Sequence, residues 1–196
     1  MQIIETGIPG LLRLEPRVFR DERGFFLETY RRDLFAALGV PAGFVQDNHA
    51  RSEQPGVLRG LHFQLPPATQ AKLVWVTRGS VFDVAVDLRA GSPTYGKWYG
   101  CELSERNFAR LFVPRGFAHG YMTLEPGTEF QYKVDAYYSP ERDAGIAWDD
   151  PDLGITWPDI APALPILSDK DRRLPRLRDF QSPFTFEPAP PAKADA

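Results

Sequence analysis

Short apolar and aromatic runs, each closed by glycine, proline, asparagine or aspartate, place the tightest limit on how this chain can fold. The runs long enough to form strands span residues 24–27, 72–77, 81–88, 108–113 and 129–137. Many short strands with closely spaced turn signals favour a β-sandwich or barrel over an alternating α/β fold. The 19 prolines also fit a loop-rich β protein better than a helical bundle. The sequence therefore predicts an all-β fold.

Helical signals are scarce and peripheral. Residues 33–38 carry the pattern of a short surface helix, because Gly39 and Pro41 supply stop signals directly after it. A second short helix is predicted to begin at Ser168, with Asp171 three positions later in a capping-box arrangement. We therefore expect only a few short helices around the sheets.

The chain is predicted to form a single domain over residues 1–182, which includes the short C-terminal helical segment. No break in composition divides these residues into two units. Residues 183–196 are rich in proline and alanine, and this composition predicts a tail whose end is flexible.

Composition narrows the range of partners. The formal net charge of -3 argues against general nucleic-acid binding, which requires a basic face. No apolar stretch approaches the roughly 20 residues that span a bilayer, and the N-terminus lacks the features of a signal peptide. The single cysteine, Cys101, has no partner for an internal disulfide. We expect a cytoplasmic protein that binds neither nucleic acid nor membrane, although a few Lys and Arg residues can still converge on an anionic ligand.

Residues 128–135 alternate cleanly between apolar and polar side chains. Phe130, Tyr132 and Val134 share one face of the predicted strand, and the residues between them are charged or polar. Tyr132 should therefore point inward among apolar neighbours, where its hydroxyl needs a partner. The pattern alone favours a structural tyrosine of the core, and a chemical role needs further support.

The residues at the positions where a metal site is expected give little support for one. The segment Pro114-x-Gly116-x-x-His119 resembles the second motif of the cupin superfamily, whose members are jelly-roll β-barrels. In metal-binding cupins an earlier His-x-His pair and a carboxylate complete the ligand set. The corresponding segment here is His62-Phe63-Gln64, with no acidic residue before Lys72, and His49 lies outside the pattern. These residues are poor ligands for a transition metal, so we predict no metal and no other cofactor.

Without a metal, His62 has two interpretations. An imidazole titrates near neutral pH and can therefore act as a general base. A core histidine bonded to a backbone carbonyl is the structural alternative, and the residues taken in isolation favour it.

Several stretches, in order and spacing, carry a wider resemblance. They are residues 19–28 (FRDERGFFLE), 44–49 (FVQDNH), 56–64 (GVLRGLHFQ), 81–87 (VFDVAVD), 114–120 (PRGFAHG), 131–133 (QYK) and 167–171 (LSDKD). Any one of these is weak, but together they are highly specific. From residue 3 to about residue 178, the chain resembles the dTDP-4-dehydrorhamnose 3,5-epimerase family. The resemblance implies a cupin-like jelly-roll β-barrel.

The resemblance also implies proton-transfer roles for four residues. His62 abstracts the protons at C3 and C5 of a 4-keto sugar, and Asp171 orients its imidazole and stabilises its charge. Lys72 meets the negative charge that grows on the C4 oxygen. Tyr132 returns a proton at C5 from the opposite face of the sugar. The resemblance does not identify the donor at C3, for which water is a candidate. A helix cap at Asp171 and a solvated strand-end lysine at Lys72 remain the structural alternatives.

A further set of residues is implied to bind the nucleotide diphosphate and the sugar. These are Arg23, Glu28, Gln46, Asp47, Asn48, Arg59, His119, Asp143 and Lys170. In the family, the segment from Arg23 to Glu28 reaches into the neighbouring subunit's site, so the resemblance implies a homodimer. Asp143 stands where a glutamate is expected, which puts affinity in doubt more than reaction type.

The implied function is epimerisation at C3 and C5 of dTDP-4-dehydro-6-deoxy-D-glucose to give dTDP-4-dehydro-L-rhamnose, in dTDP-L-rhamnose biosynthesis. An epimerase that inverts only C5 or only C3 of a related dTDP-4-keto sugar, in natural-product deoxysugar biosynthesis, is the alternative with the same acid–base set. A metal cupin and a non-catalytic sugar-nucleotide-binding barrel are the alternatives from other classes. Gln64 weighs against the first of these, and the joint presence of an acid, a base and a cation weighs against the second.

Overall fold

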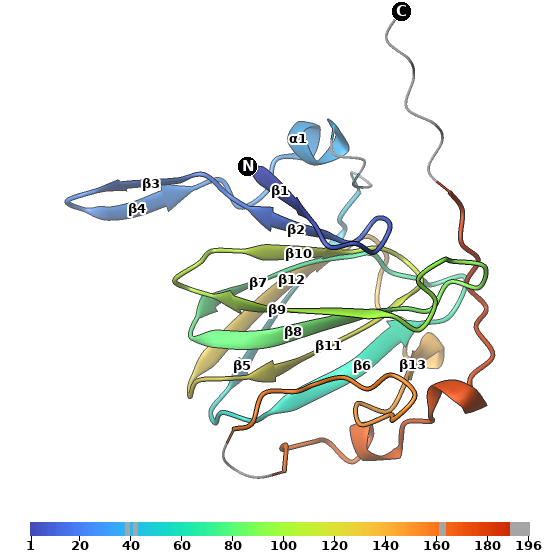
Figure 1. Ribbon diagram of the computed structural model, residues 1–196. Helices are drawn as coiled ribbons and strands as arrows, with labels where there is room; N and C mark the ends of the chain where they lie inside the picture. Colours follow the sequence, from blue (N-terminus) through green and yellow to red (C-terminus); the bar gives the residue numbers. More distant parts are fainter. Residues whose placement is uncertain (38–39, 41–42, 161–163, 189–196) are drawn as a thin grey trace, which may run out of the picture.

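Two large antiparallel sheets face each other, and a two-stranded hairpin projects from one side (Figure 1). The computed structural model describes residues 1–37, 40, 43–160 and 164–188. The two packed sheets, with little helix around them, form a cupin-like jelly-roll barrel. The predicted all-β fold class is therefore confirmed.

The six-stranded sheet contains, in spatial order, β1 (Gln2–Glu5), β2 (Leu12–Glu15), β10 (Arg110–Val113), β7 (Lys72–Arg78), β12 (Thr128–Val134) and β5 (Gln46–Ser52). The five-stranded sheet contains β13 (Asp143–Gly145), β6 (Leu58–Gln64), β11 (Phe117–Thr123), β8 (Ser80–Asp87) and β9 (Trp98–Ser104). The projecting hairpin consists of β3 (Val18–Asp21) and β4 (Gly24–Leu27).

Two strands are shorter than the sequence predicted. β10 begins at Arg110 because Phe108 has a φ of 54°, outside the β region, and the Asn107 side chain accepts the Ala109 N–H at 2.9 Å. β12 ends at Val134 because the carboxylate of Asp135 accepts the Ala71 N–H at 2.7 Å and turns the chain away from the sheet. The bond at Asn107 is local, whereas the bond from Ala71 to Asp135 joins residues that are distant in sequence.

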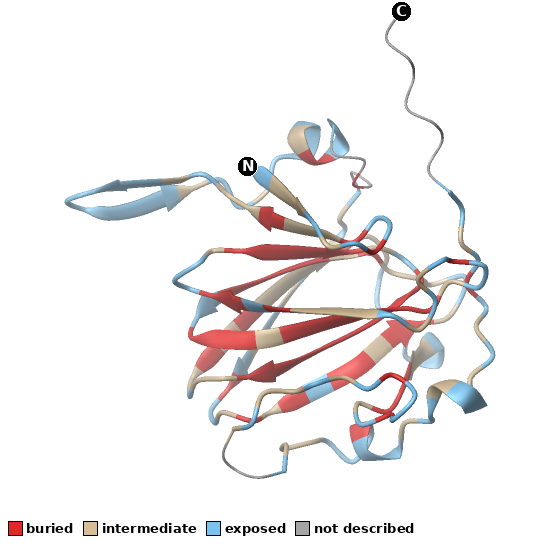
Figure 2. Cartoon of the chain, in the orientation of Figure 1, coloured by how far each residue is buried: buried red, intermediate tan, exposed pale blue. Residues whose placement is uncertain are grey.

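The core between the sheets follows from the alternation along each strand. β7 contributes Val74 and Val76, β12 contributes Phe130, and the facing β11 contributes Phe117 and Tyr121. All of these side chains are buried, and Figure 2 shows the buried strands of both sheets around them. The alternation predicted for residues 128–135 is present, with Phe130 and Val134 buried and Tyr132 packed against the same cluster.

A C-terminal strap, residues 164–188, covers the outer face of the five-stranded sheet (Figure 1). It joins β6 where the Leu58 N–H donates to Ile166 O at 3.0 Å. Farther along, Phe180 and Phe184 pack on Phe63, with ring centroids 5.1 and 5.6 Å apart. The strap therefore lies directly behind β6. The predicted domain boundary at residue 182 stays a prediction, and residues 189–196 lie outside the described residues.

Helix α1 (Arg32–Ala37) forms where a surface helix was predicted, and its buried Phe35 packs with Trp75 and Phe112 on the outer face of the six-stranded sheet. Its predicted end at Leu38 and Gly39 lies outside the described residues. The segment after Ser168 forms only a 3-10 turn, η2 (Asp171–Arg173). Within the described ranges, no helix is long and apolar enough to cross a membrane.

Candidate active site

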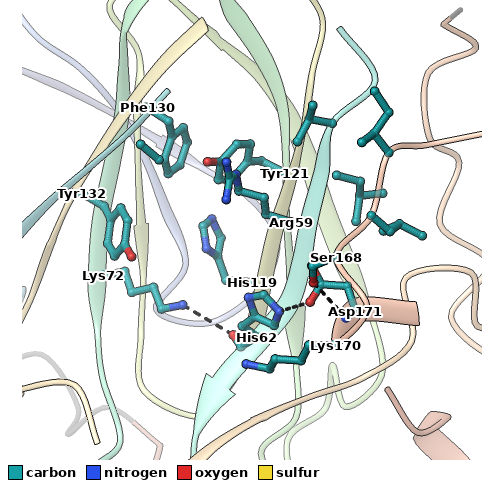
Figure 3. Close-up of a pocket in the computed structure, with 15 residues that line it drawn as sticks. Arg59, His62, Lys72, His119, Tyr121, Phe130, Tyr132, Ser168, Lys170 and Asp171 are labelled. Carbon is teal, nitrogen blue, oxygen red and sulfur yellow. Dashed lines mark hydrogen bonds and ion pairs between the residues drawn. The ribbon is translucent and has the colours of Figure 1, made fainter. Parts of the chain in front are cut away.

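A cavity of about 450 Å³ opens between the two sheets (Figure 3). Strands of both sheets and the C-terminal strap supply its walls. The lining residues are Ala50, Val57, Leu58, Arg59, His62, Lys72, His119, Tyr121, Phe130, Tyr132, Ile166, Leu167, Ser168, Lys170 and Asp171. All four residues predicted to transfer protons are among them, together with Arg59, His119 and Lys170 from the predicted binding set.

His62 and Asp171 form a hydrogen-bonded pair at one end of this cavity. The Nε2 atom of His62 lies 2.5 Å from Oδ1 of Asp171, and the His62 side chain is 29% exposed whereas Asp171 is 4% exposed. Because an ionised carboxylate only accepts, Nε2 carries a proton in this pair, and in the neutral form of the ring the lone pair is on Nδ1. Burial alone raises the pKa of Asp171, but the hydrogen bond and charge interaction with His62 outweigh it and hold that pKa below its usual range.

The position of Asp171 depends on a partial capping box. The backbone N–H of Asp171 donates to Ser168 Oγ at 3.1 Å, as the sequence pattern predicted. The Asp171 side chain does not complete the box, since its carboxylate binds His62 instead. The two interpretations of Asp171 are therefore compatible: its backbone belongs to the turn and its side chain to the histidine.

Lys72 begins β7 and extends into the cavity below Tyr132 (Figure 3). Its Nζ lies 3.5 Å from the backbone oxygen of His62. Burial lowers the pKa of Lys72 to about 8, although Asp83 and Asp143 oppose the shift. This is a half-buried cation next to the histidine on the cavity wall, so the solvated strand-end alternative does not describe it.

Tyr132 approaches the cavity from the opposite side to His62. It lies on β12 of the six-stranded sheet, whereas His62 lies on β6 of the five-stranded sheet. Burial raises the pKa of Tyr132, with Arg59 opposing the shift, so its phenol is protonated at neutral pH. A ligand in the cavity thus lies between an imidazole on one wall and a phenol on the other.

A bulge at Gly60 brings Arg59 and His62 to the same face of β6. His119 pairs with His62 and Tyr121 pairs with Arg59, so two residues of β6, Gly60 and Leu61, lie opposite the single Gly120 of β11. Without this extra residue, positions 59 and 62 would point to opposite faces. Gly60 is required because its φ is 133° and a Cβ there would lie 2.6 Å from the Cα of Gly120.

His119 lies deeper in the cavity and has its own carboxylate partner. Its Nε2 is 3.0 Å from Oδ1 of Asp83, and both side chains are buried. Burial lowers the pKa of His119 below its ordinary value, although Asp83 opposes the shift. The sequence patterns assigned no role to Asp83. The feature that could have identified it is an acidic residue in the middle of the apolar run from Val81 to Val86.

Asp143 does not line the cavity itself and is held by two neighbours, one of which does. Its carboxylate accepts hydrogen bonds from Lys170 Nζ and, at 3.0 Å, from the hydroxyl of Tyr138. Lys170 precedes Asp171 in the strap, whereas Asp143 begins β13. The shorter acid therefore binds a cavity lysine directly.

The predicted binding residues on β5 lie on two different faces of the strand. Gln46 and Asn48 share a face with Ala50, which lines the cavity, and the Gln46 amide donates to Asn48 at 2.9 Å. Asp47 points to the other face, where it binds Lys133 at 2.7 Å. Its binding role stays a prediction, and the structure does not bring it to this cavity.

Arg23 and Glu28 also lie away from the cavity, at the projecting hairpin and its base (Figure 1). The Arg23 side chain is 85% exposed and binds Asp21 in the hairpin turn, and Glu28 lies 3.8 Å from Arg31. A role for either residue in binding requires a second copy of the chain, as the family resemblance implies.

Gln64, which takes the place of a metal-binding histidine, is fully engaged in holding loops. Its amide donates to Ala68 O at 2.7 Å and to Tyr137 O at 3.3 Å, and its carbonyl accepts the Ser139 N–H at 2.6 Å. Among the residues that the structure describes, no group of three or more His, Cys, Asp and Glu side chains could hold a metal ion. The absence of a bound metal stays a prediction.

Comparison with known proteins identifies the family. A family model described as dTDP-4-dehydrorhamnose 3,5-epimerase matches residues 5–179. The chain belongs to the dTDP-4-dehydrorhamnose 3,5-epimerase family. The predicted resemblance is thereby confirmed, and the chain is an enzyme of the isomerase class.

Individual members of this epimerase family are similar over most of the chain. The dTDP-4-dehydrorhamnose 3,5-epimerase of Sinorhizobium fredii is 51% identical over 186 residues, which is 95% of this chain and 94% of that protein. The Escherichia coli enzyme of the same name is 52% identical over 175 residues, or 89% and 93%. A crystal structure from Legionella pneumophila, a dTDP-6-deoxy-D-glucose-3,5-epimerase in complex with dTDP-4-keto-L-rhamnose, has a TM-score of 0.90 at 44% identity and covers 95% of this chain and 99% of that one.

Tyr121 is a cavity residue of this epimerase to which the sequence patterns assigned no role. It follows His119 by two positions on β11 and so shares its face, which is the signal that places it in the cavity. Because it lies in a continuous buried strand, the same pattern also describes an ordinary core tyrosine.

Proposed function

We propose that the chain inverts C3 and C5 of dTDP-4-dehydro-6-deoxy-D-glucose and yields dTDP-4-dehydro-L-rhamnose, in dTDP-L-rhamnose biosynthesis. One observation carries the proposal: the His62–Asp171 pair and the Tyr132 phenol face each other across one cavity, with the Lys72 ammonium beside them. The names and identities of the relatives from Sinorhizobium fredii and Escherichia coli support the substrate.

Proton removal begins at the free Nδ1 of His62. This atom accepts the proton from the carbon next to the C4 ketone, and the electrons of the C–H bond move into the ketone to form an enolate. Asp171 stabilises the imidazolium that results, because its buried carboxylate stays ionised at the other ring nitrogen. The Lys72 ammonium stabilises the growing charge on the C4 oxygen, a contribution worth about 10²–10³ in rate.

Proton return takes place on the opposite face of the sugar. Inversion requires that the acid and the base lie on different sides of the same carbon. Tyr132 meets this requirement at C5, because it comes from the sheet that faces His62 and its raised pKa keeps the hydroxyl protonated. Water serves as the donor at C3.

The proposal includes a homodimer in which the hairpin of one copy brings Arg23 to the cavity of the other. The exposed hairpin supports this arrangement, because Phe25 and Phe26 are 58% and 67% exposed in the single chain. A cytoplasmic location belongs to the same proposal, and a cytosolic pool of sugar nucleotide is what the reaction needs.

The reaction in deuterated water, followed by NMR, tests the proposed function. Wild-type protein should incorporate solvent deuterium at both C3 and C5 of the dTDP-keto sugar and give the L-rhamnose configuration. Deuterium and inversion at one carbon only would replace the proposal with the single epimerase. No exchange at either carbon would overturn it.

A further inference from the structure

Tyr121 and Arg59 lie side by side at the end of the cavity remote from Asp171 (Figure 3). The two residues are cross-strand partners on β11 and β6. Within the part of the chain that the structure describes, neither the Tyr121 hydroxyl nor the Arg59 guanidinium has a hydrogen-bond or ion-pair partner. A hydroxyl and a cation, both without partners, therefore face the same space.

The Tyr121 ring does not need its hydroxyl in order to pack. The ring stacks on Phe130 with centroids 3.9 Å apart and an interplanar angle of 18°, and the residue is only 5% exposed. A phenylalanine would make the same stack without placing a polar group there. The hydroxyl borders the cavity instead of being sealed in the core, so it is available to a polar group that enters from outside.

The chemistry of the two side chains selects an anion. A guanidinium binds phosphate oxygens through charge-assisted hydrogen bonds, and a neutral hydroxyl next to it adds a donor without adding charge. Burial raises the pKa of Tyr121 above its ordinary value, with Arg59 opposing the shift, so the phenol keeps its proton at neutral pH. It can then donate to an anion throughout the working range of the enzyme.

The layout of a sugar nucleotide matches this position. If the reacting carbons lie between His62 and Tyr132, then C1 of the same ring carries the diphosphate only a few bonds away. The bulge at Gly60 sets Arg59 on the same face as His62, farther along β6. The phosphate next to the sugar is thus directed toward Arg59 and Tyr121.

We propose that the Tyr121 hydroxyl donates a hydrogen bond to the phosphate that Arg59 binds, and that Tyr121 is a further substrate-binding residue of this enzyme. The inference rests on the proposed function, because that function places a sugar nucleotide in the cavity.

Calorimetric titration of the Tyr121→Phe variant with dTDP and with thymidine tests this contact. The variant keeps the stack on Phe130, so the dissociation constant for dTDP should rise about tenfold while that for thymidine stays the same. With the dTDP-keto sugar, the loss should appear in KM, and kcat should change by less than about twofold. Tyr99→Phe is the matched control, because Tyr99 packs on the same core without lining the cavity, and its affinity for dTDP should equal that of wild type.

Unchanged affinity for dTDP in Tyr121→Phe would overturn the inference. Equal weakening of dTDP and thymidine binding would also overturn it, because the contact would then not be with phosphate. The melting temperature separates a structural role: it should stay the same, because the stack on Phe130 is kept and the hydroxyl faces the cavity, and a fall would mean that the hydroxyl stabilises the fold. Wild-type protein that binds dTDP but exchanges no sugar proton would defeat the proposed function and leave this inference standing.

Discussion

At the scale of single residues, the cavity brings together side chains that differ in charge and protonation. Burial keeps Tyr132 protonated and destabilises the proton on Lys72, while His62 helps to keep Asp171 ionised. An acid, a base and a cation thus coexist in about 450 Å³ at one pH. The residue types set these states at neutral pH, and the location of each group shifts its pKa.

The pKa of Lys72 predicts how the rate depends on pH. With a pKa of about 8, Lys72 carries its charge below this pH and loses it above, so kcat should fall as pH rises through about 8. A guanidinium stays charged, so the kcat of the Lys72→Arg variant, whatever its value at neutral pH, should not fall as the pH rises above about 8. Lys72→Met should lose about 10²–10³ in kcat below that pH, and its deficit relative to wild type should shrink above it, where Lys72 is neutral as well. Steady-state pH profiles of the three proteins provide the measurement, and an unchanged alkaline fall in Lys72→Arg would assign that fall to another group.

The residue roles could be predicted only in part from sequence patterns. Alternation placed Tyr132 inward, but nothing periodic connects His62 with Asp171, which are 109 positions apart. That pair came from the family resemblance. Tyr121 and Asp83 were missed because a buried tyrosine or acid in an apolar strand gives the same pattern whether it packs or binds.

At the scale of elements, β6 connects the cavity to the C-terminal strap. His62 points into the cavity, while the adjacent Phe63 points outward and packs on Phe180 and Phe184. The same strap carries Asp171 to His62. Packing behind β6 therefore supports both members of the hydrogen-bonded pair of His62 and Asp171.

The Phe184→Ala variant measures this packing. Phe184 is 6% exposed and lies in the cluster behind the five-stranded sheet, so its truncation should lower the free energy of unfolding by about 3 kcal/mol. Tyr137→Ala is the control, because that side chain is 71% exposed and its loss should change stability by less than about 0.5 kcal/mol. Denaturant unfolding gives both values. Equal effects would mean that the strap does not pack on β6 in solution.

Element bounds show where sequence patterns stop being informative. The helix at α1 and the strands β7 and β8 were predicted within a residue or two, because periodicity and stop signals agree there. The end of β12 depends on Asp135 bonding to Ala71, which is distant in sequence. The bulge at Gly60 depends on a partner strand and left only a glycine as its signal.

At the scale of the whole molecule, packing within a single chain does not explain the exposed apolar side chains on the hairpin of β3 and β4. It extends away from the barrel with three exposed phenylalanines, Phe19, Phe25 and Phe26 (Figures 1 and 2). Exposed apolar surface of this kind marks an interaction site. Under the proposed function its partner is a second copy of the chain.

The Phe26→Asp variant tests this assembly by analytical ultracentrifugation. Wild-type protein should sediment as a dimer, and the variant should shift toward monomer because a charge replaces an apolar contact. Its kcat/KM should fall as well, since Arg23 would no longer reach the neighbouring cavity. Tyr95→Asp changes an exposed aromatic elsewhere and should remain dimeric. A wild-type protein that is monomeric and fully active would contradict the proposal that a second copy contributes to the site.

The central claim is that one imidazole, His62, removes the protons at both C3 and C5. The most direct measurement compares the His62→Ala variant with wild type by NMR in deuterated water, alongside dTDP binding by calorimetry. We expect the variant to bind dTDP while exchange stops at both carbons. Exchange that persists at either carbon in a folded, dTDP-binding variant would show that another group is the base.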